Sequence, residues 1–185
     1  MATIKHHSDF LSALASIYKP RVYVELGLYV GETINKVSPW CEQAYGVDTK
    51  LDRVYVDDKY KHKINLYQGT TDTFFTEIWN KNKTIDMAFI DADHKAESAF
   101  RDLQNVLKYL TPGGVVIMHD TDPISEFYKD PGLCGDSYRL VSIIEKDPML
   151  NIVTIPIEEA GLSMITRKDE TRTCIRDNNT LPKNY

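Results

Sequence analysis

The sequence predicts an α/β fold, a Rossmann-like, doubly wound and mostly parallel seven-stranded sheet with a C-terminal antiparallel hairpin. Strand-like and helical runs alternate along most of the chain, as they do in successive βαβ units. The run 115–118 is apolar throughout, which is typical of a strand covered by helices on both faces. Two last strand-like runs, 152–157 and 162–166, are joined by a loop of hairpin length, which predicts an antiparallel pair at or near the sheet edge.

The first two elements are indicated by side-chain spacing and by the residues that end them. Residues 5–18 carry apolar side chains at helical spacing, and Ser8 or Asp9 suits the N-cap of that helix. The β-rich run 21–26 follows and closes at Gly27. The sequence therefore predicts an N-terminal helix that leads directly into the first strand.

The later elements follow the same alternation. A short helix is expected over 31–37, ending before Pro39. The clearest amphipathic pattern lies in 94–110, and the Thr-Pro-Gly-Gly sequence at 111–114 is expected to end that helix. The other strands are expected at 44–47, 64–67 and 85–90, and the other helices at 71–79 and 138–146.

The composition is that of an ordinary globular protein. Of the 185 residues, 42 % are hydrophobic and 26 % are charged, which excludes a disordered, collagen-like or membrane protein. The net charge of −5 argues against a nucleic-acid partner. The three cysteines include no pair at CxxC spacing, so they favour neither a disulfide framework nor a zinc knuckle. We expect a cytoplasmic protein with one domain over 1–168, including an N-terminal helix within 1–20, and a polar tail over 169–185.

The ends of the predicted strands carry the residues that could bind a ligand or take part in catalysis. In sheets of this type, ligands bind outside the carboxyl ends of the strands, near the point where strand order reverses. The residues at those ends are Glu25 and Gly27, Asp48, 69–72, 91–94 and 119–121. Because these ends meet at one edge of the sheet, the sequence predicts that they form one ligand site.

The loop from Glu25 to Gly31 can turn sharply around a ligand. Gly27 and Gly31 permit a tight backbone turn and close approach. Tyr29 stands where a dinucleotide-binding loop needs glycine, and the lysine of a P-loop is missing, so neither phosphate-binding motif is present. The carboxylate of Glu25 would repel a phosphate and suit a cationic ligand. Taken alone, the loop is equally consistent with a plain tight turn.

Asp48 closes the second predicted strand. A carboxylate at that place can accept hydrogen bonds from both hydroxyls of a ribose. By itself, a solvated aspartate at a strand end is the simpler interpretation. The glycine loop on the neighbouring strand makes the nucleoside interpretation the stronger one.

Four segments together resemble the class I S-adenosylmethionine-dependent methyltransferases, and most of all the small O-methyltransferases and their macrocin-type sugar relatives. They are ELGLYVGET (25–33), GVDTK (46–50), FIDADH (89–94) and LTPGGVVIMHD (110–120). The resemblance extends over about residues 20–168. Its order and spacing are specific for the fold and cofactor, and less specific for the reaction.

The resemblance implies a role for each matching position in holding S-adenosylmethionine. The methionine part would be lined by the glycine loop, with Glu25 as support, and Asp48 would hold the ribose. The adenine would lie by the segment 69–72, and the methyl end would face the residues after the fourth strand. The implied cofactor residues are Glu25, Gly27, Tyr29, Gly31, Asp48, Thr70, Thr71, Asp72, Asp91 and Ala92.

Many members of this family also carry a divalent metal, and the corresponding positions here are Asp91, His119 and Asp120. The two carboxylates suit a hard cation such as Mg²⁺. The family's ligands are an acidic residue after the fourth strand and an acidic pair, or Asp-Asn, after the fifth. His119 departs from that pattern, and imidazole favours Mn²⁺ or another transition metal. A hydrogen-bonded strand end without metal is the equal alternative.

His94 falls where relatives of the family place a general base. An ordinary histidine titrates near ~6.5, which suits removal of a proton from a hydroxyl at neutral pH. Asp93 is the second candidate for that role, although it also suits the N-cap of the following helix. His6 and His7 are expected to face solvent rather than bind metal, because no acidic or cysteine partner stands at ligand spacing.

These features predict an enzyme that transfers a methyl group from S-adenosylmethionine to a hydroxyl of a small molecule, a phenol or a sugar. The Asn-Pro-Pro-Tyr type of motif found in amino methyltransferases is absent, which favours oxygen. Two alternatives stay open: a non-catalytic module that binds the cofactor or a nucleoside, and a nicotinamide-dependent oxidoreductase. The loop 121–136 is expected to be a substrate lid or a subunit contact, so homo-oligomerisation is also open.

Overall fold

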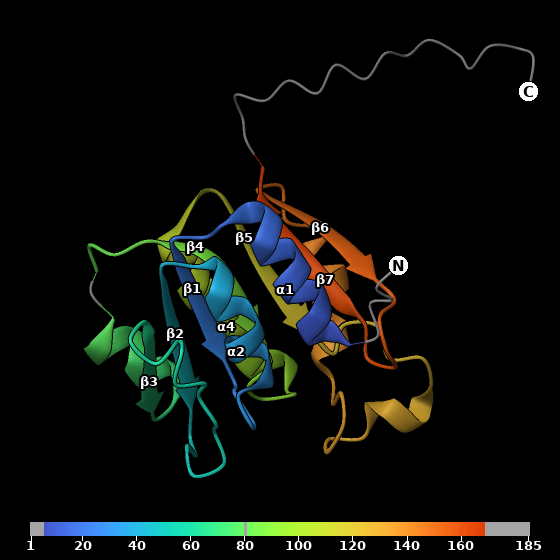
Figure 1. The fold of residues 1–185 in the computed structure, drawn as a ribbon. Coiled ribbons are helices and arrows are strands. Elements are labelled where there is room, and N and C mark those ends of the chain that lie inside the picture. Colours follow the sequence, from blue (N-terminus) through green and yellow to red (C-terminus); the bar gives the residue numbers. More distant parts are fainter. Residues whose placement is uncertain (1–5, 80, 169–185) are drawn as a thin grey trace, which may run out of the picture.

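The computed structural model describes residues 6–79 and 81–168, and it confirms the predicted fold class. One seven-stranded sheet has the order β3-β2-β1-β4-β5-β7-β6 (Figure 1). The first five strands pair in parallel, whereas β7 is antiparallel to both of its neighbours, as the predicted hairpin requires. The strands are β1 (Val22–Leu26), β2 (Gln43–Asp48), β3 (Ile64–Gln68), β4 (Ile85–Ile90), β5 (Leu110–His119), β6 (Leu150–Ile155) and β7 (Leu162–Arg167).

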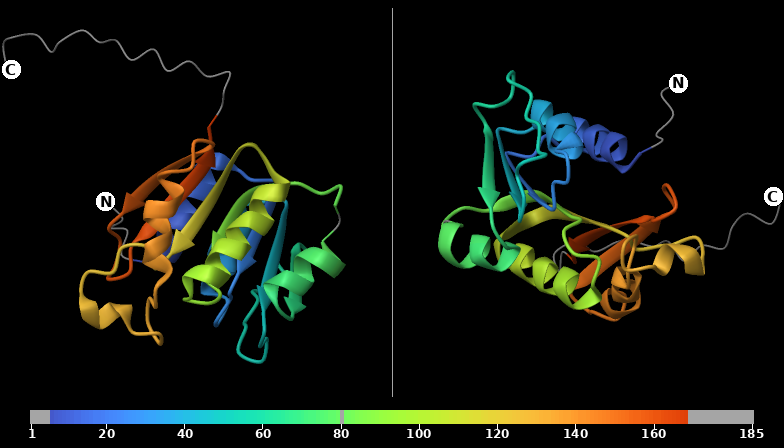
Figure 2. Two further views of the ribbon diagram at one scale, coloured as in Figure 1. Left: turned by 180° about the vertical axis from the view of Figure 1, so that it is seen from behind. Right: turned by 90° about the horizontal axis from the view of Figure 1, so that it is seen from below.

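Helices cover both faces of the sheet. Seen from below, α1 and α2 lie on one face, and α4 and the segment around α3 lie on the other (Figure 2). The α-helices are α1 (His7–Tyr18), α2 (Glu32–Val37), α3 (Thr71–Thr73), α4 (Ala96–Tyr109) and α5 (Leu140–Ile144). Shorter turns of 3₁₀-helix span Ser38–Trp40, Glu126–Lys129 and Ser137–Arg139, and a π-helical turn spans Phe74–Ile78.

Each helical layer buries its own hydrophobic cluster against the sheet. On the inner face of α4, Ala99, Leu103 and Val106 join one cluster with the aromatic side chains that follow β3, which are Phe74, Phe75 and Trp79. Under α1 and α2, residues such as Leu11 and Ile34 pack on the opposite face. The central strand β4 is buried along its whole length, which follows from its cover on both faces. The strand ends lie side by side because of the parallel register, in which Leu26 pairs with both Val47 and Ile90.

Two element ends differ from the prediction. The helix α1 is capped by His6 and not by Ser8 or Asp9, because the His6 side chain accepts the amide hydrogen of Ser8. The helix α4 begins at Ala96, two residues later than predicted, and its N-cap is Lys95. Asp93 is therefore not a capping residue.

The Thr-Pro-Gly-Gly segment does not separate helix from strand as expected. The strand β5 begins at Leu110, directly after α4, and includes this segment. Ile85 pairs with Leu110, whereas Met87 pairs with Val115, so the register shifts and the segment bulges from the ladder. Residues 111–114, which the sequence pattern suggests for a loop, therefore form a bulge within β5.

Strand order reverses between β1 and β4. The chain runs outward from β1 to β2 and β3, then returns to the other side of β1 at β4. Gly27 follows β1 and Asp91 follows β4, and a Cβ atom on Gly27 would lie 2.1 Å from the carbonyl oxygen of Asp91. The backbones meet so closely here that only glycine fits.

The described residues contain no helix that is both long and apolar enough to cross a bilayer. The predicted polar tail 169–185 and Cys174 lie outside the described residues. Cys41 and Cys134 are buried and are not joined in a disulfide.

Candidate functional site

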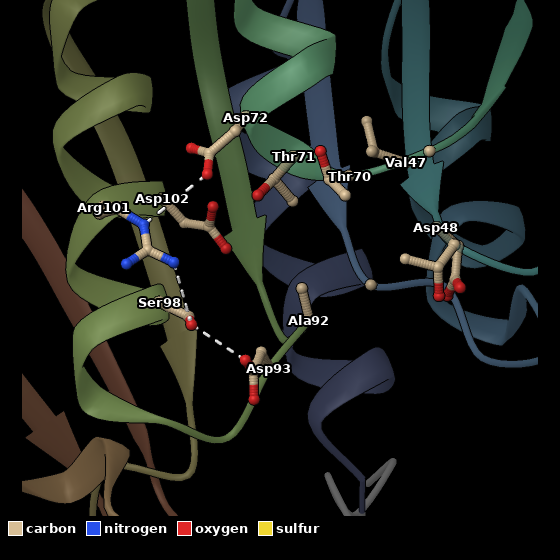
Figure 3. Close-up of a pocket in the computed structure, with 13 residues that line it drawn as sticks. Val47, Asp48, Thr70, Thr71, Asp72, Ala92, Asp93, Ser98, Arg101 and Asp102 are labelled. Atoms are coloured by element: carbon tan, nitrogen blue, oxygen red, sulfur yellow. Dashed lines mark hydrogen bonds and ion pairs between the residues drawn. The ribbon is translucent and has the colours of Figure 1, made fainter.

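Two cavities open at the carboxyl ends of the parallel strands. The first, which we call the Thr70 cavity, has a volume of about 240 Å³ (Figure 3). It is lined by Gly27, Val47, Asp48, Thr49, Gly69, Thr70, Thr71, Asp72, Ala92, Asp93, Ser98, Arg101 and Asp102. All of the predicted adenine-side residues therefore reach one space.

The second cavity, which we call the His119 cavity, has a volume of about 560 Å³. Its lining includes His6, His7, Glu25, Tyr29, Phe89, Asp91, His94, His119, Asp120, Tyr128 and Cys134. Gly27, Asp48 and Ala92 line both cavities, so the two spaces meet at the glycine loop. The predicted cofactor, metal and base residues thus converge at one end of the sheet.

Asp48 holds the glycine loop in place. Its Oδ2 accepts the amide hydrogens of Leu28 at 2.9 Å and Tyr29 at 3.2 Å. Tyr29 has a φ of 51° and a 75 % exposed side chain, so these bonds hold an unusual backbone conformation. Oδ1 of Asp48 accepts the amide hydrogen of Lys50 at 2.9 Å. An ionised carboxylate has about four acceptor sites, so these three bonds leave room for a ligand hydroxyl on Oδ1. Contact with ribose stays a prediction.

Glu25 is buried beneath the same loop. The hydroxyl of Tyr23 donates to its Oε2 at 2.7 Å, and the amide of Ile34 also bonds to its carboxyl group. Burial raises the pKa of Glu25 to about 8, which favours the neutral acid at pH 7. A neutral Glu25 neither repels a phosphate nor attracts a cation. Its contacts support the loop by tying β1 to the start of α2.

The predicted residues 70–72 form the far wall of the Thr70 cavity. Thr70 caps α3, with its Oγ1 accepting the amide hydrogen of Thr73 at 3.1 Å. Oδ2 of Asp72 lies 3.7 Å from Nε of Arg101 (Figure 3). The wall is thus completed by a helix that lies far along the chain.

Three residues of α4 that face this cavity were missed by the sequence reasoning: Ser98, Arg101 and Asp102. Their spacing of three and four residues puts them on one helix face, and that spacing is the signal that could have found them. Asp102 is 3 % exposed and hydrogen-bonds to Thr71, toward which it points in Figure 3. Burial raises the pKa of Asp102 to about 6.

Asp91, His119 and Asp120 form a close cluster in the His119 cavity. Nδ1 of His119 lies 3.3 Å from Oδ1 of Asp91 and 3.3 Å from Oδ1 of Asp120. Neighbouring side chains on a strand normally point to opposite faces. The φ of 61° at Asp120 ends β5 and lets its side chain meet that of His119.

The charges in this cluster depend on one another. Burial alone would lower the pKa of His119, but the charge and hydrogen bond of Asp91 outweigh it and raise the pKa to about 10. Glu158 adds to this effect from the other side of the ring, where its Oε2 lies 3.4 Å from Nε2. Without a metal, a protonated His119 is the cation at the centre of the cluster.

The donor set also fits a divalent metal. One donor atom each from Asp91, His119 and Asp120 lies within 4.8 Å of the other two. Ligands of an ion bound at about 2.1 Å with tetrahedral angles lie about 3.4 Å apart, which is close to the two 3.3 Å separations. Two oxygens and one imidazole nitrogen suit a transition metal better than Mg²⁺.

His94 lies beside this cluster, and Asp93 does not. Nε2 of His94 is 3.6 Å from Oδ2 of Asp120, and the ring lines the His119 cavity. Asp93 instead lines the Thr70 cavity, where its Oδ2 accepts a hydrogen bond from Ser98 at 2.9 Å. The structure therefore separates the two candidates for a base.

The prediction that the N-terminal histidines face solvent was wrong for His7, whereas the side chain of His6 is 43 % exposed. The side chain of His7 is only 13 % exposed, and its Nδ1 lies 3.0 Å from Oε2 of Glu158. Nε2 of His6 lies 3.3 Å from the other oxygen, Oε1. The acidic partner that seemed to be missing comes from the loop between β6 and β7, which no local pattern could reveal.

Comparisons with known proteins agree with this geometry. A family profile described as a methyltransferase domain matches residues 24–121, just over half of the chain. No curated protein matches the chain. Many solved structures match it at low sequence identity.

Three of these structures illustrate the range. The O-methyltransferase from Bacillus cereus in complex with S-adenosylhomocysteine is 16 % identical with a TM-score of 0.67, over 91 % of this chain and 83 % of that chain. TomG from Streptomyces achromogenes, an O-methyltransferase involved in tomaymycin synthesis and in complex with S-adenosylmethionine, is 16 % identical with a TM-score of 0.70, over 91 % and 82 %. The N-methyltransferase NodS from Bradyrhizobium japonicum is 15 % identical with a TM-score of 0.64, over 89 % and 95 %. Together with the family profile and the four sequence segments, they lead to one assignment. The chain belongs to the methyltransferase domain family and has the Rossmann-like fold of the class I S-adenosylmethionine-dependent methyltransferases.

Proposed function

We propose that the protein transfers the methyl group of S-adenosylmethionine to a hydroxyl oxygen of a small molecule. The observation that carries this proposal is the meeting of the two cavities at Gly27, Asp48 and Ala92. A nucleoside in the Thr70 cavity would put its sulfonium end at that junction. The acceptor would then lie in the His119 cavity, beside the group that takes its proton.

The residues present fit the cofactor. The backbone at Gly27, which lines both cavities, leaves no room for a Cβ atom beside Asp91. Asp48 would accept the ribose hydroxyls, and Thr70, Thr71 and Asp72 would surround the adenine. The cofactor supplies an electrophilic methyl group on a positively charged sulfur. Direct displacement then depends on how well the protein aligns donor and acceptor.

His94 is the residue that we assign as general base. Its backbone carbonyl accepts the amide hydrogen of Asp136 at 2.9 Å, and Gly135 packs against that same carbonyl. These contacts fix the backbone of His94 at the cavity wall. When His94 takes the acceptor proton, its ring becomes positively charged. The carboxylate of Asp120 lies 3.6 Å from Nε2 and stabilises that imidazolium.

A divalent cation held by Asp91, His119 and Asp120 is part of the proposal. Such an ion would orient an acceptor hydroxyl and lower its pKa. His119 must give up its Nδ1 proton to serve as a ligand, so metal binding should release protons. The donor set predicts better support of activity by Mn²⁺ than by Mg²⁺.

Oxygen is the preferred acceptor atom on two grounds. The relatives from Bacillus cereus and Streptomyces achromogenes are O-methyltransferases, and the Asn-Pro-Pro-Tyr motif is absent here. NodS shares the fold and is an N-methyltransferase, so the fold alone does not choose the acceptor. A nicotinamide-dependent oxidoreductase is no longer a serious alternative for a member of a methyltransferase family.

The test begins with binding. S-adenosylhomocysteine at a hundredfold excess over its Kd should stabilise the protein by about 2.7 kcal/mol in thermal unfolding. Asp48→Ala should weaken that binding by about 1.5–3 kcal/mol in calorimetry, because a charge-assisted hydrogen bond is lost. Unchanged affinity in that variant would remove Asp48 from the site.

Turnover is then measured with catechol-type phenols and simple sugars, with EDTA, Mn²⁺ or Mg²⁺ present. His94→Ala should reduce the rate by about 10²–10⁴-fold with little change in cofactor affinity. His62→Ala, which removes an exposed histidine elsewhere, is the matched control. Full activity in EDTA would refute the metal, and full activity of His94→Ala would refute the base. Cofactor binding without any transfer would favour the non-catalytic module.

A further inference from the structure

We propose that His6, His7 and Glu158 form a second site for a divalent transition-metal ion, next to the Asp91–His119–Asp120 cluster. One donor atom from each of the three residues lies within 4.8 Å of the other two. The site uses the start of α1 and the loop after β6, which lie side by side in the fold. It goes beyond the proposed methyl transfer, because it requires no cofactor and no acceptor.

The donor atoms are already close to the spacing that one ion imposes. Nδ1 of His7 lies 3.0 Å from Oε2 of Glu158, and Nε2 of His6 lies 3.3 Å from Oε1. Imidazole and carboxylate ligands of a tetrahedral ion bound at about 2.0–2.2 Å lie about 3.3–3.6 Å apart. Small side-chain shifts would therefore suffice to admit an ion between the carboxylate and the two rings.

The surrounding structure holds these side chains in place. The ring of His7 stacks on Phe89 with centroids 5.5 Å apart, and the backbone amide of His7 donates to Oε1 of Glu158 at 3.2 Å. The side chains of His7 and Glu158 are 13 % and 14 % exposed. Glu158 keeps a φ of 55°, a conformation that a glutamate adopts only when its surroundings require it. Two of the three ligands, His7 and Glu158, are thus held in place before any ion arrives, whereas the side chain of His6 is 43 % exposed.

The ligand chemistry defines the class of ion. Two imidazoles and one carboxylate suit Zn²⁺, Mn²⁺, Fe²⁺ or Co²⁺, and they leave coordination positions open. His6 and His7 line the His119 cavity, so an open position would face whatever molecule occupies that cavity. Oε2 of Glu158 also lies 3.4 Å from Nε2 of His119, which joins the two clusters through a single carboxylate.

The competing interpretation is a set of ion pairs that anchors the start of α1 to the loop after β6. In that case the three residues contribute stability, and the protein binds no ion through them. The two interpretations predict different metal stoichiometry, which can be measured without any assay of methyl transfer. Failure of the proposed function would therefore leave this test intact.

The experiment uses the full chain purified without a polyhistidine tag, stripped with a chelator and titrated with Co²⁺. Bound Co²⁺ is counted by its visible absorption and by elemental analysis after desalting, and competition with Zn²⁺ gives relative affinity. Glu158→Gln and His7→Ala should each bind one equivalent fewer than the parent, with affinity at this site reduced at least about 100-fold. His62→Ala should bind the same amount as the parent.

The double variant Asp91→Asn and Asp120→Asn separates the two clusters. It should keep the equivalent that Glu158→Gln loses, and hyperfine-shifted ring N–H signals from two histidines should be visible in its Co²⁺ proton NMR spectrum. Circular dichroism shows whether each variant is folded. Equal Co²⁺ binding by the parent and folded Glu158→Gln and His7→Ala would overturn the proposal. So would two shifted ring signals that persist when His7→Ala is added to the double variant.

Discussion

The Thr70 cavity and the His119 cavity lie side by side at the same sheet edge, yet they are built differently. The Thr70 cavity takes its residues from the turns after β1, β2, β3 and β4, and from one face of α4. Its ion pair between Asp72 and Arg101 is half-exposed and 3.7 Å long. The His119 cavity takes its charged residues from the start of α1, two strand ends and the loop after β6. Its charged groups are mostly buried and lie about 3 Å apart.

The difference teaches how each cavity responds to change. Exposed ion pairs are screened by water, so substitution of an exposed charge in the Thr70 cavity should have a limited effect on stability. Buried charges that neutralise one another leave costly unpaired partners when one is removed. The His119 cavity should therefore be sensitive to substitution, to pH and to metal, whereas in the Thr70 cavity the buried Asp102 is the exception among weakly coupled charges.

The largest effect should come from His119→Ala in the absence of metal. This change leaves Asp91, Asp120 and Glu158 without their shared cation, which should cost about 3–5 kcal/mol of unfolding free energy near pH 7. His119 has a folded pKa raised to about 10, above its ordinary 6.5. Its stabilising effect is therefore complete below pH 6.5 and disappears as the pH rises through 10. Urea unfolding of parent and variant in EDTA, from pH 6.5 to 10, measures this loss. A difference that does not shrink toward pH 10 would contradict a protonated His119.

Gly27→Ala tests the junction of the two cavities and should have the next largest effect. A Cβ atom would lie 2.1 Å from the carbonyl oxygen of Asp91, at a φ of 89° that alanine avoids. We expect a loss of about 3 kcal/mol or more and no binding of S-adenosylhomocysteine. Gly113→Ala is the matched control, because its φ is 79° but no atom lies within 4 Å of the added Cβ. It should cost only about 1 kcal/mol, and similar losses in the two variants would show that backbone strain alone is responsible.

Asp102→Asn should stabilise the protein at high pH, the opposite of the result at His119. The folded pKa of Asp102 is raised to about 6, whereas an unfolded aspartate titrates near 4. The folded state thus holds an extra proton between pH 4 and 6, so stability falls across that range. Asparagine removes this penalty, and we expect a gain of about 2 kcal/mol at pH 8 and almost none at pH 4. Chemical unfolding at both pH values tests it, and an equal effect at both would contradict the raised pKa.

The smallest effect should come from Arg101→Ala. Its pair with Asp72 is half-exposed and its partner Glu97 is 87 % exposed, so the loss of unfolding free energy should stay within about 1 kcal/mol. Cofactor affinity should change more than stability, because Asp72 would lose the cation that faces it across the Thr70 cavity. Calorimetry and thermal unfolding of the same variant compare the two. A loss of several kcal/mol in stability would show that this cavity is as strongly coupled as its neighbour.

The sequence predicted the parts of the site that lie within single strand-end motifs. Gly27, Asp91 and Ala92 follow a strand and Asp48 is the last residue of one, and parallel pairing brings those ends to one edge. The sequence did not indicate Arg101 or Asp102, although their helical spacing contained the information. It also set Asp93 beside His94 as an alternative base, whereas the fold directs the two side chains into different cavities.

What the sequence determined by itself was the fold class, the order of the elements and the glycine turn after β1, whereas the expected turn at 111–114 lies inside β5. Periodicity and glycine are local signals, because hydrophobic burial and backbone sterics act over a few neighbouring residues. Only the tertiary structure decided that His7 would meet Glu158, and that Glu158 would in turn meet His119. These contacts join segments far apart in the chain, and they form because a charge that the fold buries is costly unless an opposite charge lies beside it. A local sequence pattern cannot show these long-range pairings, so the charged cluster around His119 could be recognised only in the folded structure.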